Sequence, residues 1–206
     1  KFLSSDVGLI NVILPGYFKV NSKQSRLGLE FSKVNYIMNY KENRLNRIIG
    51  GHLINGFFDQ RSDYDWLVDV SILSELVTKL YHDDYKSDIF KWFEEIIVAE
   101  NRTKLLCTMV YNFTGIHGVT PSLSGCSICG SKAINSFSIN EAGFLCPIHS
   151  RNKGDKQELA FLYSLNINKD INFDEEVYEN GLELLIKYIS YYVDINIHSW
   201  KLKTRV

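Results

Sequence analysis

The chain has 206 residues, 45% of them hydrophobic and 23% charged, which is the composition of an ordinary globular protein with one large or two small domains. No apolar run approaches the roughly 20 residues of a membrane helix, and the opening KFLSSDVG lacks the apolar core of a signal peptide. The net charge of −1 hides an asymmetry, because residues 1–63 carry nine basic and five acidic side chains and the remainder carries 14 and 19. Opposite signs favour two surfaces with different partners, although a chance distribution gives the same counts.

The first third of the chain has the pattern of short β-strands. The apolar run GLINVILPG ends at Pro15-Gly16, and residues 33–40 alternate with the period of a half-buried strand. KENR at 41–44 is a polar turn, after which LNRIIGGHLI can return as the partner strand. Gly50-Gly51 inside that strand indicates a bulge or sharp bend. These features predict a small antiparallel barrel or sandwich.

From residue 63 onward the apolar residues recur at helical spacing. Asp63 or Asp65 can cap a first helix that extends to Leu80, and Ser87 can cap a second. Gly115 can end a third helix that begins near residue 103. Two further amphipathic helices are expected at about 156–165 and 175–193.

Three of the four cysteines and one histidine lie within residues 125–149. Cys126 and Cys129 are separated by two residues, and Cys146 and His149 repeat that spacing after sixteen intervening residues. Paired knuckles of this kind are typical of a zinc ribbon with a tetrahedral Cys3His site. Gly130 lets the backbone turn back under the metal, and INSFSINEAGF between the pairs can form a hairpin that turns at NEAG. The sequence therefore predicts a Zn²⁺ site at Cys126, Cys129, Cys146 and His149.

Two alternatives to this site remain open. The four residues could be reduced side chains in a surface loop, although exposed free thiols are a liability, or water or an outside ligand could replace His149. A catalytic zinc needs an open coordination position and a nearby acid or base. Zinc deaminases supply it from a His-x-Glu motif, whereas His117 here is followed by Gly118-Val119. Four protein ligands close the site, so we expect a structural metal.

The rest of the chain does not assemble a catalytic site. Cys107 lies among apolar residues of the third helix and is expected to be a small buried side chain. The histidines are scattered without a matching nucleophile, and there is neither a phosphate-binding glycine loop nor a dinucleotide fingerprint. We therefore expect a protein that is not an enzyme.

A basic, β-rich first third followed by a helical body with a late pair of knuckles resembles the RecO family of bacterial recombination and DNA-repair proteins. The resemblance rests on several stretches that together span most of the chain. They are GLINVILPG with YFKVNSKQSRLG, FTGIHGVTPSLSGCSICG with FSINEAGFLCPIH, and the ending YYVDINIHSWKLKT.

This resemblance implies an α+β fold. An N-terminal OB-fold-like β-barrel at residues 1–62, lacking its first strand, would precede an all-helical domain at 63–206. A zinc-ribbon-like finger would be inserted into that domain at about 124–150. Two departures from the family pattern stand out. The resemblance implies an opening strand and hairpin before Lys1, so we expect an OB-fold that is either incomplete or numbered from a truncated start. His149 stands where cysteine is common in the family.

The resemblance also implies a function in DNA repair and recombination after DNA damage. Family members bind single- and double-stranded DNA and anneal complementary strands without being enzymes. With RecR they help to load RecA onto DNA coated by the single-stranded-DNA-binding protein (SSB), whose C-terminal tail they contact. The implied location is the bacterial cytoplasm, in association with the nucleoid and not with a membrane.

The first third offers the cations and aromatic rings with which an OB-fold holds single strands. The predicted DNA-binding residues are Lys19, Lys23, Arg26, Arg44 and Arg47. Tyr17, Phe18, Tyr36 and Tyr40 could stack on bases, although Tyr36 and Tyr40 fit the buried face of their strand equally well. Lys201, Lys203 and Arg205 form a second, smaller basic group. The competing hypotheses are a zinc-stabilised protein-interaction adaptor that binds no nucleic acid and a metal-dependent hydrolase.

Overall fold

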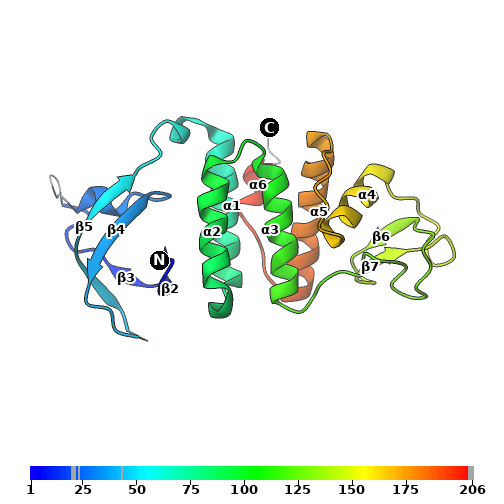
Figure 1. Ribbon diagram of the computed structural model, residues 1–206, viewed down its shortest axis with the longest axis horizontal. Coiled ribbons are helices and arrows are strands. Elements are labelled where there is room, and N and C mark those ends of the chain that lie inside the picture. Colours follow the sequence, from blue (N-terminus) through cyan, green and yellow to red (C-terminus); the bar gives the residue numbers. More distant parts are fainter. Residues whose placement is uncertain (20–21, 23, 43, 204–206) are drawn as a thin grey trace.

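A computed structural model describes residues 1–19, 22, 24–42 and 44–203 of the protein. Helices form the middle of an elongated molecule, a small sheet lies at one end, and a short hairpin lies at the other (Figure 1). The central helices are α1 (Tyr64–Leu80), α2 (Lys86–Val98), α3 (Arg102–Ile116) and α5 (Glu175–Val193). The shorter α4 (Lys156–Asn166) packs on α5, and α6 (Trp200–Lys203) packs on α1.

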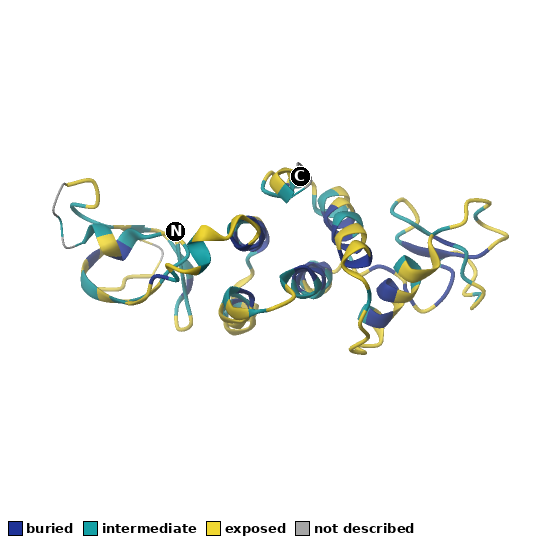
Figure 2. Cartoon of the chain, turned by 90° about the horizontal axis from the view of Figure 1, so that it is seen from above, coloured by how far each residue is buried: buried dark blue, intermediate teal, exposed yellow. Residues whose placement is uncertain are grey.

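The hydrophobic core belongs to this helical body. Viewed from above, buried residues concentrate in the central helices, while the two ends are mostly intermediate or exposed (Figure 2). Trp66, Leu73 and Leu80 on α1 are fully buried, as their helical spacing predicts. On α5 the buried stripe includes Leu185 and Ile189. Packing between helices therefore supplies most of the apolar burial that stabilises the chain.

The N-terminal module, residues 1–62, contains five strands in two small sheets. Strands β1 (Phe2–Ser4) and β2 (Gly8–Ile10) pair only with each other. The other sheet has the order β3-β5-β4, in which β3 (Val12–Ile13) runs parallel to β5 (Asn46–Asn55) and β4 (Lys33–Met38) runs antiparallel to it. The short 3₁₀ turns η1 (Ser25–Gly28) and η2 (Gln60–Ser62) also belong to this module, whereas η3 (Asp83–Tyr85) connects α1 and α2.

These sheets confirm the mixed α+β class and the predicted hairpin, but not the OB-like barrel. None of the sheets formed by the described residues closes on itself. The strands of the first hairpin, β1 and β2, pair only with each other, and Phe2 of β1 stacks on Tyr36 of β4 with ring centroids 4.5 Å apart. Strand β3 has only two residues, which are too few to close a barrel. The predicted bulge is present, because the pairing shifts between Ile37↔Gly50 and Met38↔Ile48 and leaves Ile49 unmatched.

The predicted helices are present with small corrections at their ends. The Asp63 carboxylate accepts hydrogen bonds from the backbone N–H groups of the first turn of α1 and is therefore the cap. Ser87 was the wrong cap, because α2 follows the turn η3 directly and already includes Ser87. Gly115 also lies inside its helix. The chain turns instead at Gly118, where φ is +68°, a conformation that glycine adopts without steric cost.

Two carboxylates of α1 hold the C-terminal segment on the helical body. The Glu75 carboxylate accepts hydrogen bonds from the backbone N–H groups of His198 and Ser199 at 3.0 and 2.7 Å. The buried Asp69 carboxylate accepts from Lys203 at 2.7 Å and from Arg102 at 3.0 Å. Lys203 is therefore part of an internal ion-pair network and not of a free basic group, and Arg205 lies outside the described residues. No helix in the described part of the chain is long and apolar enough to cross a membrane.

Candidate metal centre and nucleic-acid interface

Two tight turns and a hairpin build the candidate metal site at the end of the molecule opposite the N-terminal module. Strands β6 (Ser136–Ser138) and β7 (Gly143–Leu145) form the predicted hairpin between the two knuckles. Phe144 and Phe137 tie this hairpin to the helical body, where the Phe137 ring lies 5.9 Å from the ring of Tyr188. The hydroxyl of Tyr192 donates a 2.7 Å hydrogen bond to the carbonyl of Ile139. Both tyrosines belong to α5, so the hairpin is docked on the last long helix.

Backbone hydrogen bonds fix the first knuckle. The N–H of Gly130 donates to the carbonyl of Cys126 at 2.8 Å, and the N–H of Cys126 donates to the carbonyl of Ser131 at 2.9 Å. Gly130 has φ of +73°, as its predicted role requires. In the second knuckle the carbonyl of Cys146 accepts from the N–H groups of His149 and Ser150 at 3.0 and 2.9 Å.

The knuckles bring all four predicted ligands together. The Sγ atoms of Cys126, Cys129 and Cys146 and a ring nitrogen of His149 lie within 4.8 Å of one another. Cys129 Sγ is 3.8 Å from Cys146 Sγ, and His149 Nδ1 is 3.4 and 3.3 Å from the Sγ atoms of Cys126 and Cys146. A tetrahedral zinc ion with ordinary bond lengths requires about 3.8 Å between sulfurs and about 3.6 Å between sulfur and nitrogen. The residues therefore fit a metal ion that binds through Nδ1 of the histidine.

The knuckle backbone also favours the thiolate form of Cys126, the form that binds a metal. Burial acts to raise the pKa of the Cys126 thiol, but hydrogen bonds from the backbone N–H groups of Cys129 and Cys146 outweigh it and lower the pKa to about 6. The pKa of His149 is raised, chiefly by its hydrogen bond to Cys126. By contrast, burial raises the pKa of the Cys107 thiol, which lies in the core and shows no exposed surface. Cys107 is therefore the structural cysteine that its sequence context predicts.

The predicted DNA-binding cations lie on the surface of the N-terminal module. Lys19, Arg26, Arg44 and Arg47 are all exposed, and Lys23 lies outside the described residues. None of the four takes part in an ion pair with another described residue. Phosphate contacts would therefore not have to break existing salt bridges of the fold.

Arg44 borders a groove that sequence reasoning did not locate. The groove has a volume of about 790 Å³ and lies where the 40–46 turn meets β2 and β3. Its lining includes Lys1, Lys41, Arg44 and Tyr40, together with the carboxylates of Glu42 and Asp83. The cations and the aromatic ring are the groups that hold a nucleic-acid backbone and a base. The two carboxylates reduce the positive charge of the groove.

Two of the four aromatic residues suggested for base stacking are committed to the fold. The Tyr36 ring is sandwiched against Phe2, its hydroxyl donates to the carbonyl of Leu27, and burial raises its pKa to about 12. Tyr17 packs on Gly28, where an added Cβ would come within 2.4 Å of its ring. Phe18 and Tyr40 are 93% and 45% exposed, and Phe18 meets the ring of Tyr17 edge-on with centroids 4.9 Å apart.

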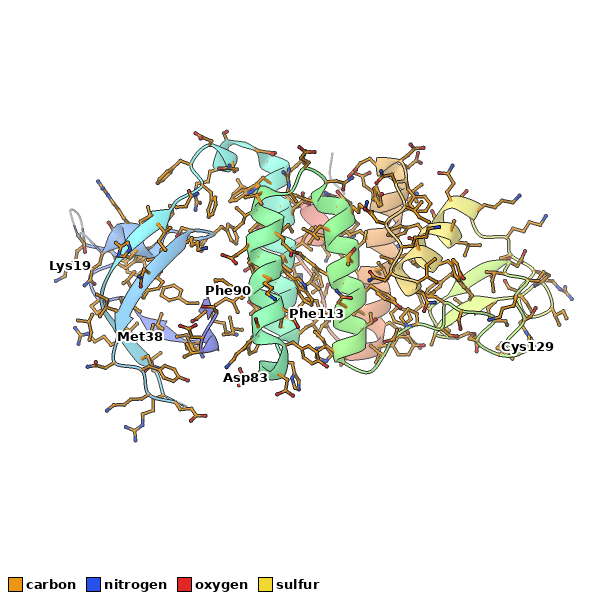
Figure 3. All side chains as sticks on the ribbon, viewed as in Figure 1. Lys19, Met38, Asp83, Phe90, Phe113 and Cys129 are labelled. Carbon is orange, nitrogen blue, oxygen red and sulfur yellow. The ribbon has the colours of Figure 1, made fainter. Side chains whose placement is uncertain are left out.

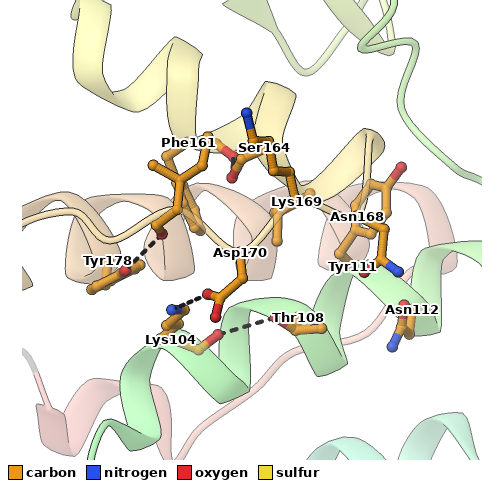
Figure 4. A pocket seen from close by; sticks show the side chains of 12 residues that line it. Lys104, Thr108, Tyr111, Asn112, Phe161, Ser164, Asn168, Lys169, Asp170 and Tyr178 are labelled. Atoms are coloured by element: carbon orange, nitrogen blue, oxygen red, sulfur yellow. Dashed lines mark hydrogen bonds and ion pairs between the residues drawn. The ribbon is translucent and has the colours of Figure 1, made fainter.

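A further cavity of about 170 Å³ lies between α3, α4 and α5 (Figure 4). Apolar surface comes from Tyr111, Phe161 and Leu165, and the Lys104 ammonium at the edge pairs with the Asp170 carboxylate. Lys169 also lines the cavity. No pattern in the sequence located this cavity.

Comparison with known proteins identifies the family. The family model described as "Recombination protein O C terminal" matches residues 61–201, which is more than half of the chain. The chain belongs to the RecO family. A DNA repair protein RecO of Desulforamulus reducens is 22% identical over 216 residues, covering 97% of this chain and 84% of the relative. A DNA repair protein RecO of Lactobacillus acidophilus is 24% identical over 156 residues, covering 72% of this chain and 62% of the relative. The RecO match begins within a few residues of α1 and includes both knuckles, so the resemblance noted in the sequence is confirmed.

Proposed function

We propose that this chain acts in DNA repair and homologous recombination as a non-enzymatic mediator that binds single- and double-stranded DNA and anneals complementary strands. The observation that carries the proposal is the membership of the RecO family, together with two curated relatives that are named DNA repair proteins. The four exposed cations of the N-terminal module support it, because unpaired cations contact phosphates at little cost. Its site of action would be the cytoplasm, on the nucleoid.

The proposed DNA-binding module spans residues 1–62, and the helical domain spans 63–206 with the metal-binding insertion at about 124–150. The start of α1 at Tyr64 supports this boundary. In the DNA-binding module, Lys19, Lys23, Arg26, Arg44 and Arg47 are proposed to contact phosphates. Because no described sheet forms a barrel with a stacking surface, phosphate contacts are expected to dominate over base stacking.

The test of this function is single-strand binding measured against salt. Changing Lys19, Lys23 and Arg26 together to Ala removes three cations, so the slope of log affinity against log salt should fall by about 2 for a single strand. Lys33→Ala is the control, because Lys33 belongs to the same module but pairs with Glu94. Fluorescence anisotropy of a labelled oligonucleotide measures the affinity of both variants at each salt concentration. An unchanged slope in the triple variant would exclude these three residues as the DNA-binding surface.

We also propose that the metal is Zn²⁺ and that its role is structural. Three thiolates and one imidazole form a common structural zinc set and fill all four tetrahedral positions. Elemental analysis should find about one zinc per chain, and refolding with other divalent ions should show zinc preferred, since thiolate ligands favour it. A site that retains another metal or none would contradict this assignment.

The proposed protein partners are RecR, with which the chain would load RecA, and the C-terminal tail of SSB. An acidic and hydrophobic tail needs an apolar pocket with a cation at its edge. The cavity between α3, α4 and α5 has this chemistry (Figure 4). Its lining includes Phe161 and Leu165, and the ammonium group of Lys104 pairs there with the carboxylate of Asp170. A labelled peptide with the acidic-hydrophobic tail sequence should bind the intact chain and lose at least tenfold in affinity on Lys104→Ala. Equal binding to both proteins would exclude this cavity.

A second candidate function is a zinc-stabilised protein adaptor that binds no DNA. One observation favours it: Ile13, Ile37, Ile49 and Ile54 are each about half exposed on the strands of the N-terminal sheet. Exposed aliphatic side chains suit protein docking better than base stacking. Absence of oligonucleotide binding at low salt by the intact, metal-loaded chain would favour the adaptor.

A further inference from the structure

The metal module, residues 124–154, presents two isoleucines that the fold does not bury. Ile128 and Ile148 occupy equivalent positions in the two knuckles, each directly before the second ligand of its pair. They are 53% and 87% exposed. Their backbones are fixed by the knuckle hydrogen bonds and not by a flexible loop. Two exposed aliphatic side chains at equivalent positions of the knuckles are available for a contact.

Three cations flank these isoleucines. Lys132 follows the first knuckle, and Arg151 and Lys153 follow the second; all three are exposed. The side-chain amide of Asn135 donates to the carbonyls of Ser150 and Asn152 at 2.9 and 2.8 Å. The backbone carbonyl of Asn135 accepts a hydrogen bond from the N–H of Gly154 at 2.8 Å. These bonds hold the loop of Arg151 and Lys153 beside the segment that carries Lys132. Figure 3 shows nitrogen-tipped side chains projecting from the end of the molecule that carries Cys129.

Two carboxylates, Glu141 and Asp155, lie near these cations in the sequence. Glu141 lies in the β6–β7 turn, whose carbonyls at Ile139 and Asn140 accept from Tyr192 of the helical body. The Asp155 carboxylate caps α4 by accepting from the N–H groups of Gln157 and Glu158. Neither carboxylate forms an ion pair with a described residue. The three cations of the metal module are therefore not neutralised by its own acids.

This positive charge contrasts with the helical body. Residues 124–154 contain three basic side chains and one acidic, whereas residues 63–123 contain five basic and ten acidic. A divalent metal bound by three thiolates contributes one negative charge, and the module remains positive. An acidic body therefore separates two basic ends in the molecule.

We propose that the metal module is a second nucleic-acid contact, in which Lys132, Arg151 and Lys153 bind phosphates and Ile148 lies against the sugars or bases. The proposal rests on the proposed function, that the chain binds DNA. Cations beside a protruding aliphatic side chain form a combination that DNA-binding proteins use, because the cations hold the backbone while the apolar group contacts or partly separates bases. With a basic region at each end, one chain can hold two DNA segments, which is what bringing two strands together requires.

The test compares two double variants of the intact, metal-loaded chain. Arg151→Ala with Lys153→Ala removes two charges from the metal module. Lys91→Ala with Lys187→Ala removes two exposed charges from the helical body, one of which pairs with Glu183, and is the control. In anisotropy titrations between 50 and 200 mM salt, the first variant should lower the salt slope by about 1.4 for a single strand and about 1.8 for a duplex. The control variant should have the same salt slope as the wild type.

An equal slope for the metal-module variant and the wild type would overturn the proposal. Ile148→Ser should weaken binding about three- to tenfold without changing the salt slope, and unchanged affinity would remove Ile148 from the contact. Because Ile148 is 87% exposed, its replacement leaves the fold intact, which metal content and circular dichroism verify.

The outcomes separate this inference from the proposed function. If the wild type binds no oligonucleotide, both fail. If the Lys19, Lys23 and Arg26 variant loses salt dependence while the metal-module variant keeps it, the N-terminal contact stands and the metal-module contact is excluded. That second result would also be expected if the isoleucines served an acidic protein partner.

Discussion

The two ends of this molecule are both small β modules, yet different forces hold them together. The N-terminal module has 62 residues, and among those that the structure describes only two large hydrophobic side chains are buried, Leu27 and Ile48. The metal module is half that length and buries Phe144, Leu145 and two of its cysteines. A short chain without a large core needs another source of stability, and the proposed metal would supply it at one end. The N-terminal module depends instead on its contact with the helical body.

The largest expected effect is on the metal module. Cys146→Ser removes a ligand that is almost fully buried, so the chain should lose its bound metal, since ligation supplies most of the folding free energy of such small sites. Hydrogen exchange followed by mass spectrometry should show loss of protection in residues 122–154 and retained protection in α1 and α3. Cys107→Ala is the control, because that thiol lies in the helical core and should leave the metal content unchanged. Full metal content in the Cys146 variant would refute the assigned ligand set.

The second prediction concerns how the N-terminal module is anchored. Phe31 and Phe57 both have φ near +50°, and both rings pack against the buried Trp66 of α1, at 6.4 and 6.5 Å between centroids. Phe57→Ala should destabilise this contact by about 2 kcal/mol, less than a fully buried Phe→Ala change because Phe57 is only partly buried. The neighbouring Phe58 is 66% exposed, so Phe58→Ala should change stability by less than about 0.5 kcal/mol.

Urea unfolding monitored by tryptophan fluorescence, with exchange in β4 and β5 as a local readout, measures both changes. Loss of protection in β4 and β5 while α3 stays protected is the expected pattern for Phe57→Ala. Equal behaviour of the Phe57 and Phe58 variants would show that ring packing on Trp66 does not anchor the module.

The contrast between the two ends also explains which features could be predicted from the sequence. The metal ligands were predictable because Cys-x-x-Cys and Cys-x-x-His are local patterns in which the knuckle geometry follows from the spacing. The helices from Tyr64 to Val193 were predictable because helical periodicity is local as well. The barrel prediction rested on strand pairing between distant segments, which local patterns do not determine.

Side-chain roles that depend on distant partners were also beyond the sequence. The sequence around Tyr36 suggested a residue that stacks on bases, yet the ring of Phe2 from β1 stacks on the ring of Tyr36. Lys203 resembles a free surface cation, yet Asp69, 134 residues away along the chain, binds it. Neither partner lies close in the sequence, so no local motif around Tyr36 or Lys203 could reveal these contacts.

The third prediction uses acid to separate the metal module from the helical body. Burial acts to raise the pKa of Glu75, but hydrogen bonds from His198, Ser199 and Lys79 lower it to about 2. A carboxyl with a depressed folded-state pKa stabilises the fold above its unfolded pKa of about 4.5, and this contribution is lost as pH falls from there toward 2. Metal release begins at higher pH, because the thiolates must be protonated and a bound metal resists this only partly.

We therefore expect two acid transitions, with loss of metal first and release of the C-terminal segment later. Metal release can be followed with a colorimetric chelator, and protection of residues 196–203 by hydrogen exchange. In Glu75→Gln the charge is absent at every pH, so the second transition should disappear. The C-terminal segment should also be less protected near neutrality, because the free energy that holds it on the helical body falls by about 1–2 kcal/mol. Simultaneous loss of metal and of this segment in the wild type would show that the module and the body unfold as one unit.

The smallest expected effect tests whether the outer face of the N-terminal sheet is free. Ile37 is 62% exposed on β4, while Ile48 on β5 is 1% exposed. Ile37→Thr keeps the β-branched shape and should change the free energy of unfolding by less than about 0.5 kcal/mol. Ile48→Ala should cost about 2–5 kcal/mol, because the side chain is almost fully buried and its removal leaves a cavity. Measured by urea unfolding of the isolated chain, a cost for Ile37→Thr above about 1 kcal/mol would mean that another copy of the chain or an unrecognised segment covers this face in solution. A negligible cost would leave four exposed isoleucines with no structural task in the free chain, and that is the condition under which a protein partner can dock on them.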